Sequence, residues 1–344
     1  MAALGTVASA VGAGVAAPSP AGSFASRANT PPRKLIVASA VVDLTGSVAE
    51  RVARVTTMLE AAAAEAAARH QGKGLDLMIF PEFAICRETG ATASERAVEL
   101  AGPALEPFKA AVRAHHTWAV LPMTLREPDA GGRLSNAAVL FDRAGQVAGI
   151  FRKVHPVVDD HGVFENGVAP GDAYPVFNCD FGRLGILICW DMSYEEAWDA
   201  LGAGGAEIVA VPTASPQNLR PAAQAQRHHY YVVNSAPRDN SSVFDPIGRT
   251  IAQVTAAPGF VVQEIDLAYA MLHWSETLHE GKALTDRFGA RVGGTYSTRE
   301  DTGVFWSNDP QVSIGSMIRE LGLKEMHEMV DKMENARLKA GPKK

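Results

Sequence analysis

Cysteine is scarce in this chain, with only three among 344 residues: Cys86, Cys179 and Cys189. Their number is odd and no two form a Cys-x-x-Cys pair, which argues against a disulfide framework and against a zinc site of the usual spacing. His327-Glu328 also lacks the second histidine that a zinc-protease helix carries. We therefore expect no bound metal ion.

Positive charge is limited as well, because 32 lysines and arginines stand against 38 aspartates and glutamates and the net charge is -6. The sequence has no basic stripe with interleaved aromatic residues, so nucleic acid is not expected as a partner. Hydrophobic residues make up 47% of the 344 positions, which is enough for one large domain with a sizeable core.

The first part of the chain lacks charge altogether. Residues 2–22 are mainly alanine, glycine and valine, and they are too rich in small residues to make a good membrane span. They resemble the hydrophobic and cleavage regions of a bacterial twin-arginine signal, although the preceding basic segment is missing. Export to the periplasm and a flexible cytoplasmic extension both remain open. In either case we expect residues 1–33 to lie outside the packed core.

Apolar runs and helical spacing alternate along the chain. Strands followed by helices come first and hairpins later, which predicts an α/β fold with a mixed sheet system flanked by helices. The predicted strands are 35–42, 75–80, 118–123, 136–141, 147–151, 185–188, 208–211, 231–234, 242–244, 250–254 and 260–265. The predicted helices are 47–70, 106–116, one after Ser193, 220–229, and an amphipathic helix around 316–338.

Three chemically useful side chains follow predicted buried strands: Glu82, Lys153 and Cys189. In α/β proteins, sites are assembled where strands end. Taken singly, Glu82 fits a solvated turn and Lys153 a surface charge. Their shared position after strands is what makes a common site the better hypothesis.

Cys189 ends the apolar run Gly185-Ile186-Leu187-Ile188, and Ser193 and Glu196 follow it with the spacing of a capping box. This pattern predicts a sharp turn from a strand into a helix that begins at Ser193, with the first amide groups pointing back toward the sulfur. A thiolate would be favoured there. From this segment alone, the alternative is that Cys189 is a small residue of the core.

Taken together, these segments resemble the nitrilase superfamily of carbon-nitrogen hydrolases. The resemblance is carried by Phe80-Pro81-Glu82, Arg152-Lys153-Val154-His155-Pro156 and Gly185-Ile186-Leu187-Ile188-Cys189-Trp190-Asp191. Further matches are Pro170-Gly171-Asp172, Gly205-Ala206-Glu207-Ile208 and Phe244-Asp245-Pro246-Ile247-Gly248-Arg249. The resemblance covers roughly residues 34 to 267 and implies a four-layer α-β-β-α sandwich.

The resemblance also implies roles for individual residues. Glu82 would be the general base, Cys189 the nucleophile, and Lys153 together with the backbone N–H of Trp190 would stabilise the oxyanion. A second glutamate, which positions substrate and lysine in this family, is expected at Glu165. This chemistry requires no metal and no organic cofactor.

The implied reaction is hydrolysis of a non-peptide C–N bond of a small amide through a Cys189 thioester, with release of an acid and ammonia or an amine. Asp191 stands where a true nitrilase usually carries glutamate, which favours amide chemistry. A nitrilase, an N-carbamoyl amino acid hydrolase and a catalytically silent scaffold of the same fold remain alternatives. The positions soon after the nucleophile hold no arginine, so a neutral or weakly polar amide is expected unless Arg227 or Arg238 reaches the pocket.

The resemblance divides the chain into three parts. Residues 1–33 form a flexible arm or a signal-peptide remnant, 34–267 the catalytic domain, and 268–344 a C-terminal extension that packs on the domain or on a partner subunit. Because tails of this kind often wrap a neighbouring subunit in relatives of this fold, we expect a homodimer or a larger homo-oligomer.

Overall fold

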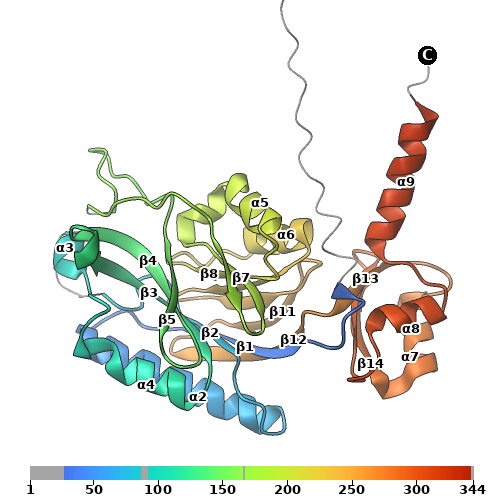
Figure 1. Ribbon diagram of the computed structural model, residues 1–344, viewed down its shortest axis with the longest axis horizontal. Coiled ribbons are helices and arrows are strands. Elements are labelled where there is room, and N and C mark those ends of the chain that lie inside the picture. Colours follow the sequence, from blue (N-terminus) through green and yellow to red (C-terminus); the bar gives the residue numbers. More distant parts are fainter. Residues whose placement is uncertain (1–26, 87–91, 166, 342–344) are drawn as a thin grey trace, which may run out of the picture.

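The computed structural model describes residues 27–86, 92–165 and 167–341. Two six-stranded sheets lie face to face, and helices cover their outer faces (Figure 1). A three-stranded sheet with its own helices forms a smaller unit at one end. None of the helices in the described part of the chain is both long and apolar enough to cross a bilayer.

The first sheet has the order β12-β1-β2-β3-β4-β5. Its central strands β1, β2 and β3 run parallel, whereas β4, β5 and β12 pair antiparallel with their neighbours. The strands are β1 (Lys34–Val41), β2 (Leu77–Ile79), β3 (Trp118–Glu127), β4 (Arg133–Phe141), β5 (Val147–Arg152) and β12 (Gly259–Asp266).

The second sheet has the order β11-β10-β9-β8-β7-β6, with β7, β8 and β9 parallel and antiparallel pairs at both edges. The strands are β6 (Val176–Cys179), β7 (Gly182–Ile186), β8 (Ile208–Pro212), β9 (Tyr231–Ser235), β10 (Ser241–Phe244) and β11 (Thr250–Val254). Both sheets therefore have parallel strands at their centre, so the ends of β2 and β7 can present side chains to a common site.

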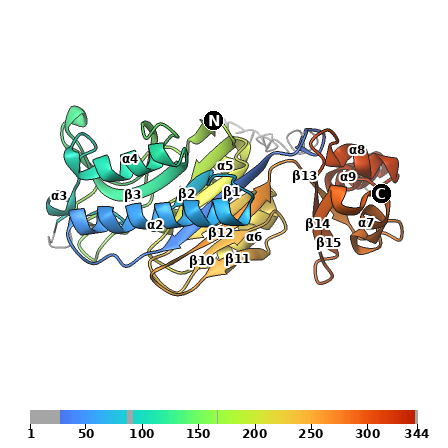
Figure 2. The same ribbon diagram turned by 90° about the horizontal axis from the view of Figure 1, so that it is seen from below.

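Alternation along β1 explains the layering. Leu35 and Val37 face the core between the two sheets, whereas Ile36 and Ala38 face a second core beneath the helices. That second core is covered by α2 (Val48–Arg69) and α4 (Glu106–Ala114), which lie side by side in Figure 2. On the other outer face lie α5 (Glu195–Ala203) and α6 (Leu219–His228). The predicted four-layer α-β-β-α sandwich is confirmed.

The long helix begins and ends where the sequence predicts. The predicted helix 47–70 corresponds to α2, because Ser47 caps the helix in a capping box with Glu50 and His70 is the C-cap. The short elements, which were not predicted, are α3 (Ala93–Arg96), η1 (Pro103–Leu105), η2 (Pro128–Ala130), η3 (Cys189–Ser193), η4 (His279–Gly281) and η5 (Gly289–Arg291).

The C-terminal unit departs from expectation. Its sheet, β13-β15-β14, was not predicted, and the single helix expected around 316–338 is two helices. Gly322 has φ +67° and ends the first helix in a Schellman motif, with Leu323 N–H bonded to Ile318 O. The elements are β13 (Tyr269–His273), α7 (Lys282–Phe288), β14 (Val292–Ser297), β15 (Thr302–Ser307), α8 (Ile314–Glu320) and α9 (Met326–Ala340).

The expectation that all of residues 1–33 lie outside the core does not hold for Arg27 and Ala28, which are buried. The Arg27 guanidinium is buried and donates to His229 O at 2.8 Å and to Tyr269 Oη at 2.8 Å, and Ala28 is part of the core of the C-terminal unit. These contacts tie the chain before β1 to the C-terminal unit. Residues 1–26, on which the question of export turns, lie outside the described residues.

Candidate active site

Glu82, Lys153 and Cys189 come together, although the first and the last are 107 positions apart along the chain. Glu82 follows β2, Lys153 follows β5 and Cys189 begins η3 just after β7. Lys153 Nζ lies 2.9 Å from Glu82 Oε1, and both side chains are only 1% exposed. All three line one cavity of about 340 Å³.

Lys153 is held between two carboxylates. Its ammonium pairs with Glu82 and with Glu165, and the Asn136 amide donates at 2.8 Å to an oxygen of each carboxylate. Burial opposes the charge on Lys153, but the two carboxylates outweigh burial and raise the pKa of Lys153. The lysine therefore remains a cation at neutral pH.

Glu165 reaches this cluster from the long loop between β5 and β6. Its backbone has φ +29°, a region that a residue with a side chain rarely adopts, and its Oε1 also accepts the Val157 N–H at 3.0 Å. Backbone strain of this kind persists only where surrounding contacts hold it. The structure thus brings the fourth predicted site residue to the same lysine.

The second oxygen of Glu82 accepts the backbone N–H of Ala214 at 2.9 Å. Ala214 follows β8, and the same amide also faces the sulfur of Cys189, as does the hydroxyl of Thr213. The carboxylate and the thiol therefore both lie close to the end of a neighbouring strand.

Cys189 is partly exposed and has φ +46°, so its backbone occupies the left-handed region. Burial and the nearby Glu82 carboxylate raise the pKa of Cys189 to about 11, although Lys153, Thr213 and the Ala214 amide act in the opposite direction. This is the reverse of the thiolate expected from the sequence. At neutral pH the resting sulfur keeps its proton and needs a base to remove it.

The predicted helix start at Ser193 is wrong, and Asp191 explains why. The side chain of Asp191 is fully buried and accepts the His155 N–H at 2.7 Å and the Ile188 N–H at 3.1 Å. These bonds wind residues 189–193 into the 3-10 turn η3, so that α5 begins only at Glu195, with no side-chain cap. The first amide groups of α5 therefore lie two residues further along the chain than the sequence predicted.

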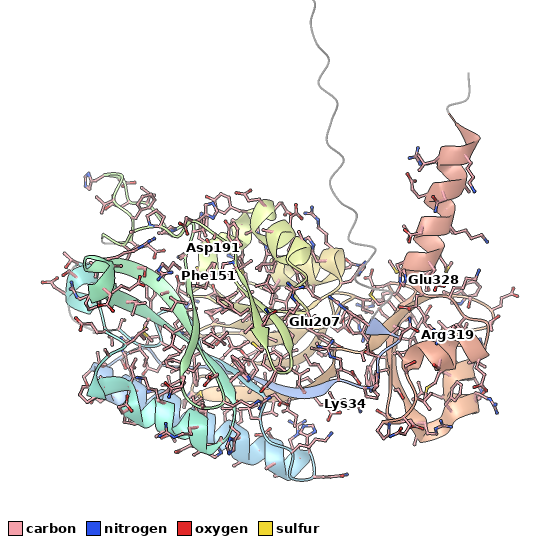
Figure 3. The ribbon with its side chains drawn as sticks, in the orientation of Figure 1. Lys34, Phe151, Asp191, Glu207, Arg319 and Glu328 are labelled. Carbon is pink, nitrogen blue, oxygen red and sulfur yellow. The ribbon has the colours of Figure 1, made fainter. Side chains whose placement is uncertain are left out.

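Asp191 also joins the lysine segment to the nucleophile segment. It is labelled in Figure 3 within the sandwich, and burial raises its pKa to about 6 despite the two amide donors. Its partner His155 stacks on Tyr194 with ring centroids 3.4 Å apart and contacts the Tyr174 hydroxyl through Nδ1 at 3.1 Å. The chain just after Lys153 is thereby fixed to the chain just after Cys189.

The cavity has two different parts. Glu82, Lys153 and Glu165 form its buried end, whereas the half-exposed Arg96 and the exposed Asp159 lie toward its mouth. Apolar side chains form much of the wall between them, namely those of Phe83, Ala93, Val157, Val163 and Val168.

Not every predicted residue faces this cavity. The Trp190 side chain is 48% exposed and is not part of the wall, so only its backbone is available for the predicted role. Arg227 pairs with Glu195 and Asp199, and Arg238 pairs with Asp239, all outside the wall.

Sequence reasoning missed Asn136, Ala214 and Arg96. Asn136 opened a predicted strand and is the one polar residue within that predicted run, which was the available signal. Ala214 contributes a backbone amide, for which its side chain gives no signal. Arg96 lies on α3, a helix of four residues that is too short for periodicity to predict.

Other features of the described residues do not offer comparable chemistry. Among them, no three His, Cys, Asp or Glu side chains are grouped so that they could hold a metal ion. A cavity of about 370 Å³ beside β11 and β12 is lined by charged groups that pair with their neighbours, including Arg249 with Asp245 at 2.7 Å and Lys34 with Glu264 at 3.3 Å. No thiol faces that cavity.

Comparison with known proteins agrees with this fold and geometry. The carbon-nitrogen hydrolase family matches residues 36–272, more than half of the chain, and the protein belongs to that family. The deaminated glutathione amidase of Yersinia enterocolitica is 30% identical over 152 residues, which is 41% of this chain and 52% of the relative. The citrullinase of Francisella tularensis is 35% identical over 103 residues, 29% of this chain and 35% of the relative. The chain spans about half the length of the first curated relatives it matches, or less.

Solved structures show the same fold. Nit3 of Saccharomyces cerevisiae, described as a member of branch 10 of the nitrilase superfamily, superposes with a TM-score of 0.57 at 19% identity, covering 70% of this chain and 92% of that chain. A mutant of the amidase of Nesterenkonia sp. AN1, which shows the result of Michael addition of acrylamide at its active-site cysteine, has a TM-score of 0.52 at 18% identity, covering 67% of this chain and 91% of that chain. The predicted membership of the nitrilase superfamily is confirmed.

Proposed function

We propose that this protein hydrolyses the C–N bond of a small amide through a thioester on Cys189. The observation that carries the proposal is the buried pair of Lys153 and Glu82, 2.9 Å apart, in a cavity that also holds the partly exposed thiol of Cys189. A buried base, a buried cation and a reachable nucleophile are the three groups that cleavage of an unreactive amide requires.

Glu82 takes the proton of Cys189 as the sulfur attacks the amide carbon. The raised pKa of Cys189 makes this base necessary, because little thiolate exists beforehand at neutral pH. The C=O bond becomes a C–O⁻ group, which the Lys153 ammonium and the backbone N–H of Trp190 stabilise. A preorganised donor of this kind contributes roughly 3–4 kcal/mol.

Glu82 then returns its proton to the leaving nitrogen, the C–N bond breaks, and ammonia or an amine departs. A thioester between the acyl group and Cys189 remains. Glu82 next takes a proton from water, whose oxygen attacks the thioester carbon, and the C–S bond breaks. The acid leaves, and the proton held by Glu82 restores the thiol, so the cycle needs no metal and no organic cofactor.

Glu165 acts as a positioning residue. Its carboxylate pairs with Lys153, and the Asn136 amide ties it to Glu82. Together these contacts keep the ammonium at one point in the cavity wall, where the oxyanion forms. A preformed position matters, because displacement by about 1 Å can cost a hundredfold in rate.

The size of the cavity supports a small substrate. A volume of about 340 Å³ is near the lower end for ligand pockets, which favours a compact amide. The relatives include proteins named as amidases, a formamidase and a citrullinase, so amide and ureido compounds are both within the range of the family.

Ammonia release from a panel of small amides, nitriles and N-carbamoyl amino acids tests the function. We expect amides to be cleaved fastest, and hydroxylamine added during turnover to divert the acyl group into a hydroxamate. Cys189→Ala should abolish turnover with the fold intact, whereas the matched variants Cys86→Ala and Cys179→Ala should keep it. Retained activity in Cys189→Ala would exclude the nucleophile, and no turnover of any class would favour a silent scaffold.

A further inference from the structure

Asp191 closes a hydrogen-bonded turn around the nucleophile. Its Oδ2 accepts the Ile188 N–H at 3.1 Å, and its own N–H donates to Ile188 O at 3.0 Å. Only Cys189 and Trp190 lie between these bonds, so residues 188–191, called the nucleophile turn below, fix the direction of the Cys189 side chain and of the Trp190 N–H. Cys189 has φ +46°, and such a backbone persists only where surrounding contacts hold it.

His155 connects the nucleophile turn to the lysine segment. Its backbone N–H donates to Asp191 Oδ1 at 2.7 Å, and its Nδ1 lies 3.3 Å from the same oxygen. Lys153 is two positions earlier in the chain. One oxygen of Asp191 therefore binds the lysine segment and the other binds the nucleophile turn, so that a single carboxylate joins the two backbones that carry the ammonium and the thiol.

A row of stacked rings supports this connection. The His155 ring stacks on Tyr194 with centroids 3.4 Å apart and on Tyr174 with centroids 6.3 Å apart. Tyr174 in turn stacks on Phe151 of β5, with centroids 6.5 Å apart. The row begins in the strand that precedes the lysine and ends just after the nucleophile turn, so it joins the same two segments as the carboxylate.

Asp191 is placed to act on the site without touching the substrate. Its side chain is 0% exposed and does not line the active-site cavity. His155 is 22% exposed, so a proton from solvent can reach the pair. The charged and titratable groups that face Asp191 and His155 include Lys153, Tyr174, Tyr194 and Glu196, together with Arg220 of α6, which donates to Met192 O.

We propose that Asp191 is a positioning residue for the nucleophile, whose ionised carboxylate keeps Cys189 beside Glu82 and Lys153 and whose protonation releases it. An ionised carboxylate accepts on both oxygens, whereas a carboxylic acid carries a hydrogen on one of them, and that oxygen becomes a donor. A proton taken up from solvent therefore weakens the hold on the lysine segment or on the nucleophile turn. The inference rests on the proposed function for its effect on turnover.

Asp191→Asn tests the positioning, because the amide nitrogen of asparagine cannot accept an N–H. We expect kcat to fall about a hundredfold, as a displacement of about 1 Å can cost, and KM to change less than about threefold, because the side chain does not line the cavity. Without substrate, iodoacetamide should alkylate Cys189 about tenfold faster at pH 8, because a sulfur that leaves the site loses the burial that raises its pKa. Alkylation of Cys179 should not change.

Asp266→Asn is the matched control. Asp266 is also buried and accepts two backbone N–H groups, from Arg33 at 2.9 Å and Ala268 at 2.8 Å, but it does not line the active-site cavity. This variant should leave kcat and the ratio of the two alkylation rates unchanged. An unchanged kcat in Asp191→Asn, or a Cys189 rate that does not rise relative to the Cys179 rate, would overturn the inference. If no amide is turned over, the proposed function fails, and the alkylation ratio still decides the inference.

The pH dependence of kcat tests the role of the charge. Burial raises the pKa of Asp191 to about 6, so kcat should fall below about pH 6 in the wild type, and Asp191→Asn should lack this fall. His155→Phe keeps an aromatic ring on Tyr194 but removes a positive charge that lowers the pKa of Asp191, so the fall should move up by about one pH unit. His228→Phe removes a histidine that likewise stacks on a tyrosine and pairs with Asp199 at 3.3 Å, and it should leave the profile unchanged. A fall that persists in Asp191→Asn, or that does not move in His155→Phe, would contradict the inference.

Urea unfolding separates release of the nucleophile from loss of the fold. Because burial raises the pKa of Asp191 above its ordinary value, its contribution to stability is complete below about pH 4 and is lost as pH rises through about 6. Acidification from pH 7 to 5 should therefore lower kcat while the urea midpoint of the wild type rises relative to that of Asp191→Asn. A difference between the two midpoints that stays constant, or changes in the other direction, would show that Asp191 does not titrate in this range and would overturn the inference.

Discussion

Replacing Lys153 by methionine should destabilise the fold by about 3–5 kcal/mol, besides abolishing turnover. Lys153 Nζ and Glu82 Oε1 are 2.9 Å apart, and both side chains are 1% exposed. At an effective dielectric constant of about 20, unit charges at that distance attract by about 6 kcal/mol, and desolvation of the two ions offsets part of this. Methionine is unbranched and of similar length, so the dominant change is the loss of the cation between Glu82 and Glu165.

Urea unfolding, followed by both circular dichroism and tryptophan fluorescence, measures this loss as a lower midpoint at unchanged slope. Adding Glu82→Gln to Lys153→Met should recover part of the stability, because one uncompensated charge disappears. The control Lys282→Met removes an exposed pair with Asp286 within α7 and should cost less than about 0.5 kcal/mol. A loss below about 1 kcal/mol for Lys153→Met, or no recovery in the double variant, would refute the reasoning.

Five further expectations concern the site. Because the pKa of Cys189 is raised to about 11, its alkylation by iodoacetamide without substrate should accelerate about tenfold per pH unit between pH 7 and 10. It should also precede the alkylation of Cys179, whose pKa is raised to about 12. Mass spectrometry follows both reactions, and a rate that reaches a plateau near neutral pH would contradict the expectation. The same shift implies that the neutral Cys189 thiol contributes fully to the stability of the fold below about pH 8.5, and that this contribution is lost as pH rises toward 11. The midpoints of urea unfolding, measured across that pH range, check this expectation. Asn136→Leu removes two amide donors from buried carboxylates and should lower the free energy of unfolding by about 1–3 kcal/mol together with kcat, and unchanged unfolding would argue against the bridge. Arg96→Met should raise KM for carboxylate-bearing amides more than for neutral amides. Arg227 lies outside the cavity, so Arg227→Met should leave both KM values unchanged. Equal effects of the two variants would rule out contact between Arg96 and substrate. Turnover should survive dialysis against EDTA, and a loss restored by a divalent ion would contradict a metal-free reaction.

The layered body of the protein could be predicted because its strands are short apolar runs and its main helix carries capping residues. The run 35–42 corresponds to β1, and Ser47 with Glu50 begins α2 as the sequence indicates. The C-terminal sheet could not be predicted in this way. Strand β14 includes Gly293 and Gly294, has mostly exposed or half-exposed residues, and depends on pairing with β15 rather than on its own pattern.

The site shows the same division between local and tertiary information. The ends of three strands indicated the candidate base, lysine and nucleophile, because a polar residue after a buried strand is a local feature. The direction of the pKa shift of Cys189 was not predictable, since it depends on burial and on a carboxylate that follows a different strand. The start of α5 was also misjudged. Ser193 and Glu196 have the spacing of a cap, but Asp191 binds the amide of His155, 36 residues away, as well as the nearby amide of Ile188, and these bonds prevail.

Strand β12 closes the first sheet by pairing with β1 over eight residues, from Lys34 opposite Asp266 to Val41 opposite Gly259. These partners are more than 200 residues apart, so a ribosome working at about 5–20 residues per second completes β12 roughly 10–45 s after β1. Throughout that interval the hydrogen-bonding edge of β1 has no native partner, and such an edge is a template for pairing with other chains. Because β12 is synthesised last among the strands of this sheet, we expect the nascent chain to need protection by chaperones until β12 has emerged.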